Sequence, residues 1–195
     1  MTTSPKILAF SGSNREGSLN QKLVEIAAGG AKKAGVEVTV INLKDIVMPL
    51  FDPDLEAEAG LPVTARQFKE LLFDHQGLLI ASPEYNSSVT PVLKNAIDWA
   101  SRRMQEDEPM LACFQGKVAV VMSTSPGGTG GLRGLRHIRE ILGNIGVLVL
   151  PEQKGIPNAY DVFNADGSLK DAKIQESVEN LGAKLAQVLL KLYRE

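Results

Sequence analysis

Small hydroxyl residues and a single arginine lie together in one short stretch, residues 11–20. Ser13, Ser18 and Asn20 can donate hydrogen bonds, and the Arg15 guanidinium can hold a phosphate through two N–H groups at once. The stretch precedes a helical pattern, so its backbone also offers the unpaired N–H groups of a helix N-terminus. We therefore expect it to hold a phosphate. Taken alone, it is equally compatible with a strand-to-helix turn in which Ser18 only caps the helix.

Residues for several other chemistries are absent from this sequence. It contains no GxGxxG dinucleotide fingerprint, no phosphate loop of the nucleoside-triphosphatase type and no GxSxG nucleophile turn. Residues 128–130 come nearest to the fingerprint, but they follow the predicted fourth strand and Arg133 replaces the third glycine. Cys113 lies outside any phosphate loop, and we interpret it as a small apolar filler. His75 and His137 have no partner at metal-ligand spacing, which favours surface or packing roles.

Length and charge limit the classes of function. A chain of 195 residues suits one domain, residues 1–195, with a sizeable core. The 21 basic and 23 acidic residues give a net charge of −2, so bulk charge gives no reason to expect a nucleic acid or a membrane as partner. A single cysteine excludes an intramolecular disulfide, and the apolar run before Ser11 is too short for a signal peptide. We expect a cytoplasmic protein.

Apolar runs and helical periodicity alternate along the chain. The pattern predicts strands over 6–10, 36–41, 77–82, 117–122 and 147–150. It predicts helices over 20–34, 65–74, 91–103, 132–143 and 170–194. Residues 43–63 read as a long connection that is either a solvated loop, which we prefer, or a mobile flap over a pocket.

Alternating strands and helices predict an α/β fold. Parallel strands need crossover helices, so five such units imply a doubly wound five-stranded parallel sheet with helices on both faces. The simplest strand order is 2-1-3-4-5, which places a crevice above strands 1 and 3. The loops after strands 1, 3 and 4 meet at that crevice, and they are the loops richest in Ser, Gly, Asn and Tyr. Their convergence favours the phosphate site over the ordinary turn.

These loops suit a mononucleotide that carries a large planar group. The loop at 83–88 and the glycine-rich loop at 125–131 would flank a ring, because glycines allow close backbone approach and offer N–H groups. Tyr85 could stack on that ring, although a partly buried anchoring aromatic is an equal alternative. Flavin mononucleotide (FMN) fits all three loops.

At these motifs the sequence resembles the NADPH-dependent FMN reductases, a family that includes bacterial quinone, azo-dye and chromate reductases. The first motif is Gly12-Ser13-x-Arg15-x-x-Ser18-x-Asn20. The second runs from Pro83-Glu84-Tyr85-Asn86-Ser87-Ser88 into Leu93-Lys94-Asn95-Ala96-Ile97-Asp98-Trp99-Ala100-Ser101-Arg102. The third is the loop Gly127-Gly128-x-Gly130-Gly131-x-Arg133. Thr90-Pro91 departs from the Pro-Gly that the family usually has at that helix start.

The resemblance implies a flavodoxin-like fold, bound FMN and a homodimer or homotetramer with FMN near a subunit interface. By resemblance, the phosphate is held by the first loop, at Ser13, Arg15, Ser18, Leu19 and Asn20. The ribityl chain and one side of the ring would be lined by Pro83, Glu84, Tyr85, Asn86 and Ser87. The other side of the ring would be lined by Ser123, Ser125, Gly127 and Gly128.

The expected activity is that of an FMN-dependent NAD(P)H oxidoreductase working by a ping-pong cycle. NADPH or NADH would give a hydride to FMN N5, and a quinone, azo dye, chromate or flavin would then take two electrons. Catalysis would depend on the flavin rather than on a catalytic side chain. Arg102 and Arg103 could guide the anionic nucleotide, although a solvated helix end is preferred. A flavodoxin-like electron carrier and a flavin-binding protein without turnover remain as alternatives.

Overall fold

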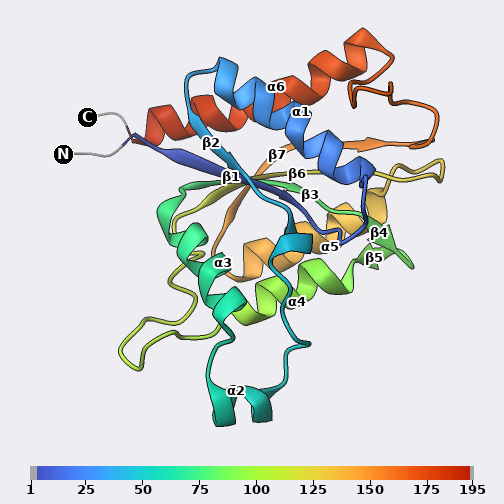
Figure 1. Cartoon of the computed structure of the whole chain (residues 1–195). Coiled ribbons are helices and arrows are strands. Elements are labelled where there is room, and N and C mark those ends of the chain that lie inside the picture. Colours follow the sequence, from blue (N-terminus) through green and yellow to red (C-terminus); the bar gives the residue numbers. More distant parts are fainter. Residues whose placement is uncertain (1–3, 194–195) are drawn as a thin grey trace.

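A five-stranded parallel sheet forms the centre of the protein in a computed structural model, which describes residues 4–193 (Figure 1). Every neighbouring pair in the sheet is parallel. The strand order confirms the predicted 2-1-3-4-5 arrangement. In spatial order the strands are β2 (Glu37–Val40), β1 (Lys6–Ser11), β3 (Gly77–Ala81), β6 (Val118–Thr124) and β7 (Leu148–Ile156).

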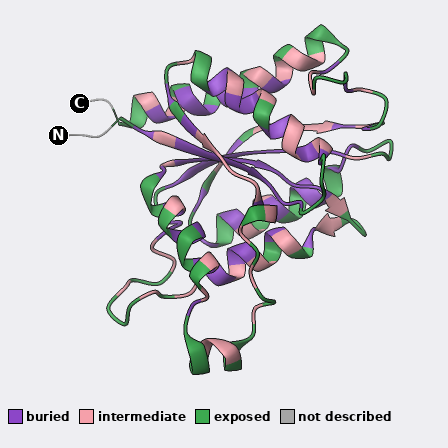
Figure 2. Cartoon of the chain, viewed as in Figure 1, coloured by how far each residue is buried: buried purple, intermediate pink, exposed green. Residues whose placement is uncertain are grey.

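Helices cover both faces of the sheet, as predicted (Figure 1). Side chains of β1 alternate between the two cores: Ile7 and Ala9 pack on one side, and Leu8 and Phe10 on the other. The buried strands run between the two helical layers in Figure 2. One layer is α1 (Leu19–Lys33) and α6 (Ala172–Leu192), and the other is α3 (Val63–Asp74), α4 (Pro91–Ala100) and α5 (Leu132–Asn144).

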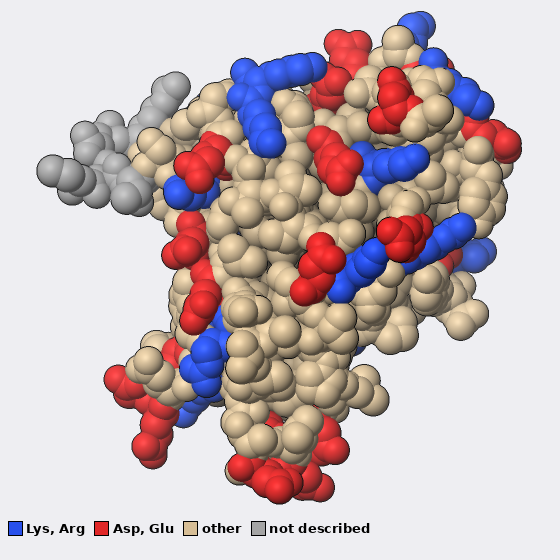
Figure 3. Space-filling model, in the orientation of Figure 1, with Lys and Arg blue, Asp and Glu red and all other residues tan. Residues whose placement is uncertain are grey.

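The connection at 43–63 is more ordered than the prediction of a loop. It contains a short 3₁₀-helix, η1 (Leu43–Asp45), and a helix, α2 (Pro53–Ala59), whose start is capped by Asp52 Oδ1 accepting from Asp54 N at 2.8 Å. Acidic side chains gather at the end of the molecule that carries α2 (Figure 3). Over the rest of the face in this view, acidic and basic side chains are mixed.

Hydrogen bonds hold this segment against α4. Trp99 Nε1 and Asn95 Nδ2 each donate to Pro49 O at 2.8 Å. Trp99 is fully buried under the segment. Arg102 Nε lies 2.9 Å from the Glu56 carboxylate, so the charge of Arg102 is paired with α2. These contacts tie the segment to α4 and to the residues just after it, and α2 lies away from the β4 and β5 strands in Figure 1.

The predicted exit loop at 83–88 is instead a small hairpin of β4 (Glu84–Tyr85) and β5 (Ser88–Val89), which stands outside the main sheet. Two strands are also longer than predicted. β7 is an edge strand and is mostly half-buried or exposed, so its apolar run, 147–150, covers only its first part. β6 continues through Ser123 and Thr124, which were expected to belong to a loop.

Candidate functional site

The turn between β1 and α1 is fixed by the elements beside it. Gly12 N donates to Ala81 O at 2.9 Å, and Thr90 Oγ1 donates to Gly12 O at 2.6 Å. Thr90 also caps α4 by accepting from Leu93 N at 3.2 Å. A Cβ at Gly12 would lie 2.7 Å from the Leu93 Cβ, so the close approach of the turn to α4 requires glycine here. The departure from Pro-Gly at Thr90-Pro91 therefore has a structural role.

The two predicted phosphate-binding hydroxyls lie in the turn between β1 and α1. Ser18 Oγ is the N-cap and accepts from Gln21 N at 3.3 Å. Ser13 Oγ accepts from Arg15 N at 3.2 Å. As acceptors in these bonds, both hydroxyls keep their own hydrogen for a ligand. The capping role and the phosphate role of Ser18 are therefore compatible.

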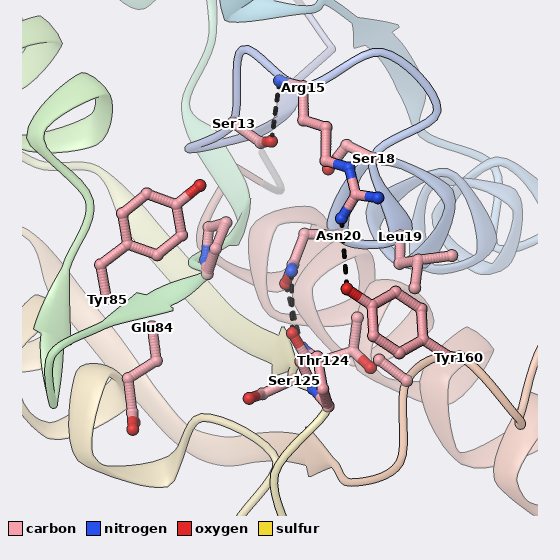
Figure 4. A pocket seen from close by; sticks show the side chains of 13 residues that line it. Ser13, Arg15, Ser18, Leu19, Asn20, Glu84, Tyr85, Thr124, Ser125 and Tyr160 are labelled. Carbon is pink, nitrogen blue, oxygen red and sulfur yellow. Dashed lines mark hydrogen bonds between the residues drawn. The ribbon is translucent and has the colours of Figure 1, made fainter.

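These residues line a cavity of about 170 Å³ at the carboxyl end of the sheet, shown in Figure 4. Its walls come from four segments of the chain: the turn after β1, the β4 region, the end of β6 and the segment after β7. The lining residues are Ser13, Arg15, Ser18, Leu19, Asn20, Pro83, Glu84, Tyr85, Thr124, Ser125, Pro126, Ala159 and Tyr160.

Arg15 extends across the cavity toward Tyr160, and its Nη1 donates to the Tyr160 hydroxyl at 3.5 Å (Figure 4). This hydrogen bond raises the pKa of Arg15 further above its ordinary value. Within residues 4–193, no carboxylate forms an ion pair with Arg15. The guanidinium is thus a fully charged group with capacity for an anion.

Asn20 joins two walls of the cavity. Its Nδ2 donates to Thr124 O at 2.9 Å, and its Oδ1 accepts from Thr124 N at 3.0 Å (Figure 4). The amide oxygen and one amide hydrogen are thereby used within the protein. The predicted role of Asn20 as a phosphate donor is reduced to its second amide hydrogen and its backbone N–H.

The hairpin supplies the opposite wall. Tyr85 lies at the cavity and is 55 % exposed, whereas the Glu84 carboxylate points away from its ring (Figure 4). Glu84 Oε2 accepts from Gly134 N at 2.8 Å, so this carboxylate is bound to α5. Asn86 and Ser87 form the turn of the hairpin and do not line the cavity.

The glycine-rich loop only partly matches the prediction. Ser125 lines the cavity, but Gly127 and Gly128 are exposed beside it. Ser123 is fully buried within β6, where a Cβ on Gly131 would collide with its hydroxyl, so it lies outside the cavity. The resemblance implied a ring-lining role for Ser123, but the strand continues through this residue.

Thr124 and Pro126, which also line the cavity, lie within the predicted wall at residues 123–128. Sequence reasoning missed two lining residues, Ala159 and Tyr160. Tyr160 carries no local signal. Ala159 N donates to Ser125 O at 3.1 Å, and this long-range bond brings the segment to the cavity.

Other candidate residues have structural roles. Cys113 is buried and its Sγ donates to Ala100 O at 3.3 Å, which confirms its role as a filler. His75 is buried, and its ring nitrogens bond Leu71 O at 2.6 Å and Thr39 Oγ1 at 2.7 Å. Across the described residues, 4–193, there is no cluster of His, Cys, Asp or Glu suited to a metal ion and no helix long and apolar enough to cross a membrane.

Comparison with known proteins matches residues 5–161 to a family model described as NADPH-dependent FMN reductase. The chain is 36% identical over 181 residues to an NAD(P)H-dependent FMN reductase of Pseudomonas aeruginosa, which covers 92% of each chain. It is 35% identical over 166 residues to a quinone reductase of Escherichia coli strain K12, with 83% of this chain and 84% of the relative covered.

Solved structures give the same picture of the fold. A flavoenzyme NAD(P)H:(acceptor) oxidoreductase from Paracoccus denitrificans superposes with a TM-score of 0.79 at 28% identity, covering 96% of this chain and 98% of its own. A flavodoxin from the domain Archaea superposes with a TM-score of 0.61 at 14% identity, covering 94% and 98%. At that identity, the flavodoxin shares the fold alone.

Proposed function

This chain belongs to the NADPH-dependent FMN reductase family and is an FMN-dependent NAD(P)H oxidoreductase, and we propose that residues 11–20 bind the phosphate of its FMN. Membership of a reductase family makes the protein an enzyme rather than an electron carrier or a binding protein without turnover. The observation that carries the proposal is the cavity in which Arg15, Ser13 and Ser18 converge.

The donors at this end of the cavity fit a phosphate. Arg15 supplies a cation, and Ser13 and Ser18 supply hydroxyl hydrogens. The first turn of α1 contains no acidic residue, so the positive end of the helix and the N–H groups of Leu19 and Asn20 face an anion without local repulsion. Charge-assisted bonds from such a set are the usual means of holding a phosphate.

The other end of the cavity fits a planar ring. Pro83 and Tyr85 lie on one side, and Ser125 and Pro126 lie on the other. An exposed aromatic ring beside a polar turn is well placed to stack on a flavin. The bonds between Asn20 and Thr124 fix the phosphate end relative to the ring end.

The chain's own residues bind and orient, because the cofactor supplies the redox chemistry. FMN held by these residues would supply the hydride and two-electron chemistry, and we propose that NAD(P)H and the acceptor use the site in turn, in a ping-pong order. Quinones are the first acceptor class to test, followed by azo dyes, chromate and free flavins. Parallel lines in double-reciprocal plots with NADPH and a benzoquinone would support the ping-pong order, and intersecting lines would contradict it.

Substitution of Arg15 tests the phosphate assignment. Arg15→Ala removes charge-assisted hydrogen bonds and should weaken FMN binding about tenfold or more, whereas Arg15→Lys should lose less because it keeps the charge. Flavin fluorescence titration of the apoprotein gives the dissociation constants. Arg66→Ala, at an exposed position on α3, is the matched control. An Arg15→Ala protein that binds FMN as tightly as the control would overturn the assignment.

Assembly, location and domain organisation are part of the proposal. We propose a homodimer or homotetramer of single-domain chains, residues 1–195, in the cytoplasm. Val47 and Leu50 are 67 % and 78 % exposed on the segment that packs against α4, and such apolar side chains favour a subunit contact. Light scattering after size exclusion measures the assembly, and a monomer at micromolar concentration would contradict it.

A further inference from the structure

The β4–β5 hairpin depends on its surroundings for its shape. Each of its strands has two residues, and both turn residues have a positive φ, 51° at Asn86 and 66° at Ser87. The turn suits a tight hairpin, but neither residue is glycine, and a non-glycine residue with a positive φ costs free energy. An isolated two-stranded hairpin is at best marginally stable in water. Other elements must therefore hold it beside the cavity.

Helix α5 is the element that holds it. Glu84 Oε2 accepts from Gly134 N at 2.8 Å, and Ser88 Oγ bonds His137 Nδ1 at 2.9 Å one turn further along. A Cβ on Gly134 would lie 3.2 Å from Ser88 O and 3.4 Å from Glu84 Cβ. The glycine lets the hairpin lie close against the helix backbone.

The start of α5 has no cap of its own. Its N-cap residue, Gly131, has no side chain to accept a hydrogen bond, and the first turn contains no acidic residue. The free N–H groups and the positive end of the helix favour a carboxylate there. Glu84 supplies it from another element, more than 40 residues earlier in the chain.

One carboxylate thus connects the two walls that would flank the ring. Adjacent strand residues point to opposite faces, so Tyr85 lies at the cavity while Glu84 reaches α5 (Figure 4). Helix α5 follows the glycine-rich loop, whose Ser125 and Pro126 form the opposite wall. The Glu84 carboxylate is thus a direct link between the Tyr85 wall and the helix that follows this loop.

We propose that Glu84 is a positioning residue: its bond to the Gly134 N–H fixes the width of the ring site, and its carboxylate makes no contact with the flavin. The inference rests on the proposed FMN site and adds to it. It predicts that FMN affinity depends more on the length of the side chain at position 84 than on its charge.

Two variants separate reach from charge. Glu84→Gln keeps the length and a carbonyl acceptor but loses the charge, whereas Glu84→Asp keeps the charge but is one methylene shorter. We expect Glu84→Gln to bind FMN within about threefold of the wild type and Glu84→Asp to bind about tenfold more weakly. The flavin midpoint potential in Glu84→Gln should stay close to that of the wild type, since the carboxylate charge is offset by the positive end of α5 to which it bonds.

Amide hydrogen exchange of the apoprotein provides a readout independent of FMN. The Gly134 amide should stay protected in Glu84→Gln and exchange faster in Glu84→Asp, together with the hairpin amides. Ser88→Ala removes only the bond from Ser88 to His137, so its hairpin amides should exchange at rates between those of Glu84→Gln and Glu84→Asp. Circular dichroism of each variant checks that the fold is retained.

The outcomes are distinct. A wild type that binds no FMN would reject the proposed function, and the exchange pattern would still decide the link between Glu84 and α5. Normal FMN binding by Glu84→Asp, or a loss in Glu84→Gln as large as that in Glu84→Asp, would overturn the positioning role. A shifted potential in Glu84→Gln would overturn it as well, by placing the carboxylate near the flavin.

Discussion

Single side chains at the cavity serve the fold and the site together. Ser18 caps α1, and Ser13 accepts a hydrogen bond from the Arg15 backbone, while both line the cavity. Asn20 uses its amide to bind the end of β6. Because these groups are held in place by the protein, little side-chain freedom is lost when an anion binds. The affinity of this site for an anion should therefore depend on how these side chains are oriented as well as on charge.

Tyr160 offers a test at the scale of the residue. Its bond to Arg15 is long and exposed, so Tyr160→Phe should change the FMN dissociation constant less than about threefold. Tyr160→Ala removes a wall of the cavity and should weaken binding about tenfold. Fluorescence titration measures both, with Tyr193→Ala at the end of α6 as the control. Equal affinities in Tyr160→Ala and the control would show that Tyr160 takes no part in binding.

Helix α1, whose N-terminus lies at the proposed phosphate end, is held by close contact with α6. A Cβ on Gly30 would collide with the backbone carbonyl of Glu179, and a Cβ on Gly182 would collide with that of Ala27. The two helices approach each other at these glycines, and Lys33 adds an exposed ion pair to Glu179 at 2.6 Å. The position of the phosphate end thus depends on residues far from the cavity.

Neighbouring glycines in α1 give the test at the scale of the element. Gly30→Ala should lower the free energy of unfolding by about 2–3 kcal/mol, because backbone must move to admit the methyl group. Gly29→Ala is the matched control: a Cβ there meets no atom within 4 Å, so the change should stabilise the protein by about 0.5–1 kcal/mol. Urea denaturation measures both. A Gly30→Ala variant as stable as Gly29→Ala would refute this contact.

At the scale of the whole molecule, the buried side chains of Cys113 and Lys117 lie near each other. Burial lowers the pKa of Lys117 from 10.5 to about 8, and its Nζ donates to His75 O. Burial raises the pKa of Cys113 from 9.0 to about 11. Neither group lines the cavity, so both affect stability rather than cofactor binding.

These shifts predict how stability depends on pH. Between pH 8 and 10.5 the unfolded chain holds a Lys117 proton that the native chain has released, so stability rises with pH. Between pH 9 and 11 the native chain keeps the Cys113 proton that the unfolded chain has lost, so stability falls. From these two groups we expect the free energy of unfolding to rise by about 1 kcal/mol from pH 8 to 9. Above pH 9 the opposite contributions of Lys117 and Cys113 should nearly cancel.

Variants separate the two groups in urea denaturation at several pH values. Relative to the wild type, Cys113→Ala should keep gaining stability above pH 9, because only the Lys117 contribution remains. Lys117→Met should lose the gain between pH 8 and 9. Identical pH profiles for the wild type and both variants would contradict the assignment.

Much of the architecture follows from patterns that are local in the sequence. Apolar runs alternating with helical periodicity determined the five parallel strands and their order, because parallel strands must be joined by crossovers. The turn after the first strand was identified for the same reason: Ser13, Arg15 and Ser18 are neighbours, and the helix that follows fixes where they lie. The edge strand β7 was predicted only in its first part, because its apolar run ends at Leu150, and the seven residues of helix α2 were read as part of a loop.

Only the tertiary structure decided which distant residues meet. Tyr160 reaches Arg15 across 145 positions in the sequence, and Glu84 reaches Gly134 across 50. Ser123 has a residue type suited to the site, yet it is buried because β6 continues through it. Propensity and periodicity act between near neighbours, whereas these contacts depend on how whole elements pack. The sequence by itself therefore determined the fold and the turn proposed to bind the phosphate, and packing determined the walls of the cavity.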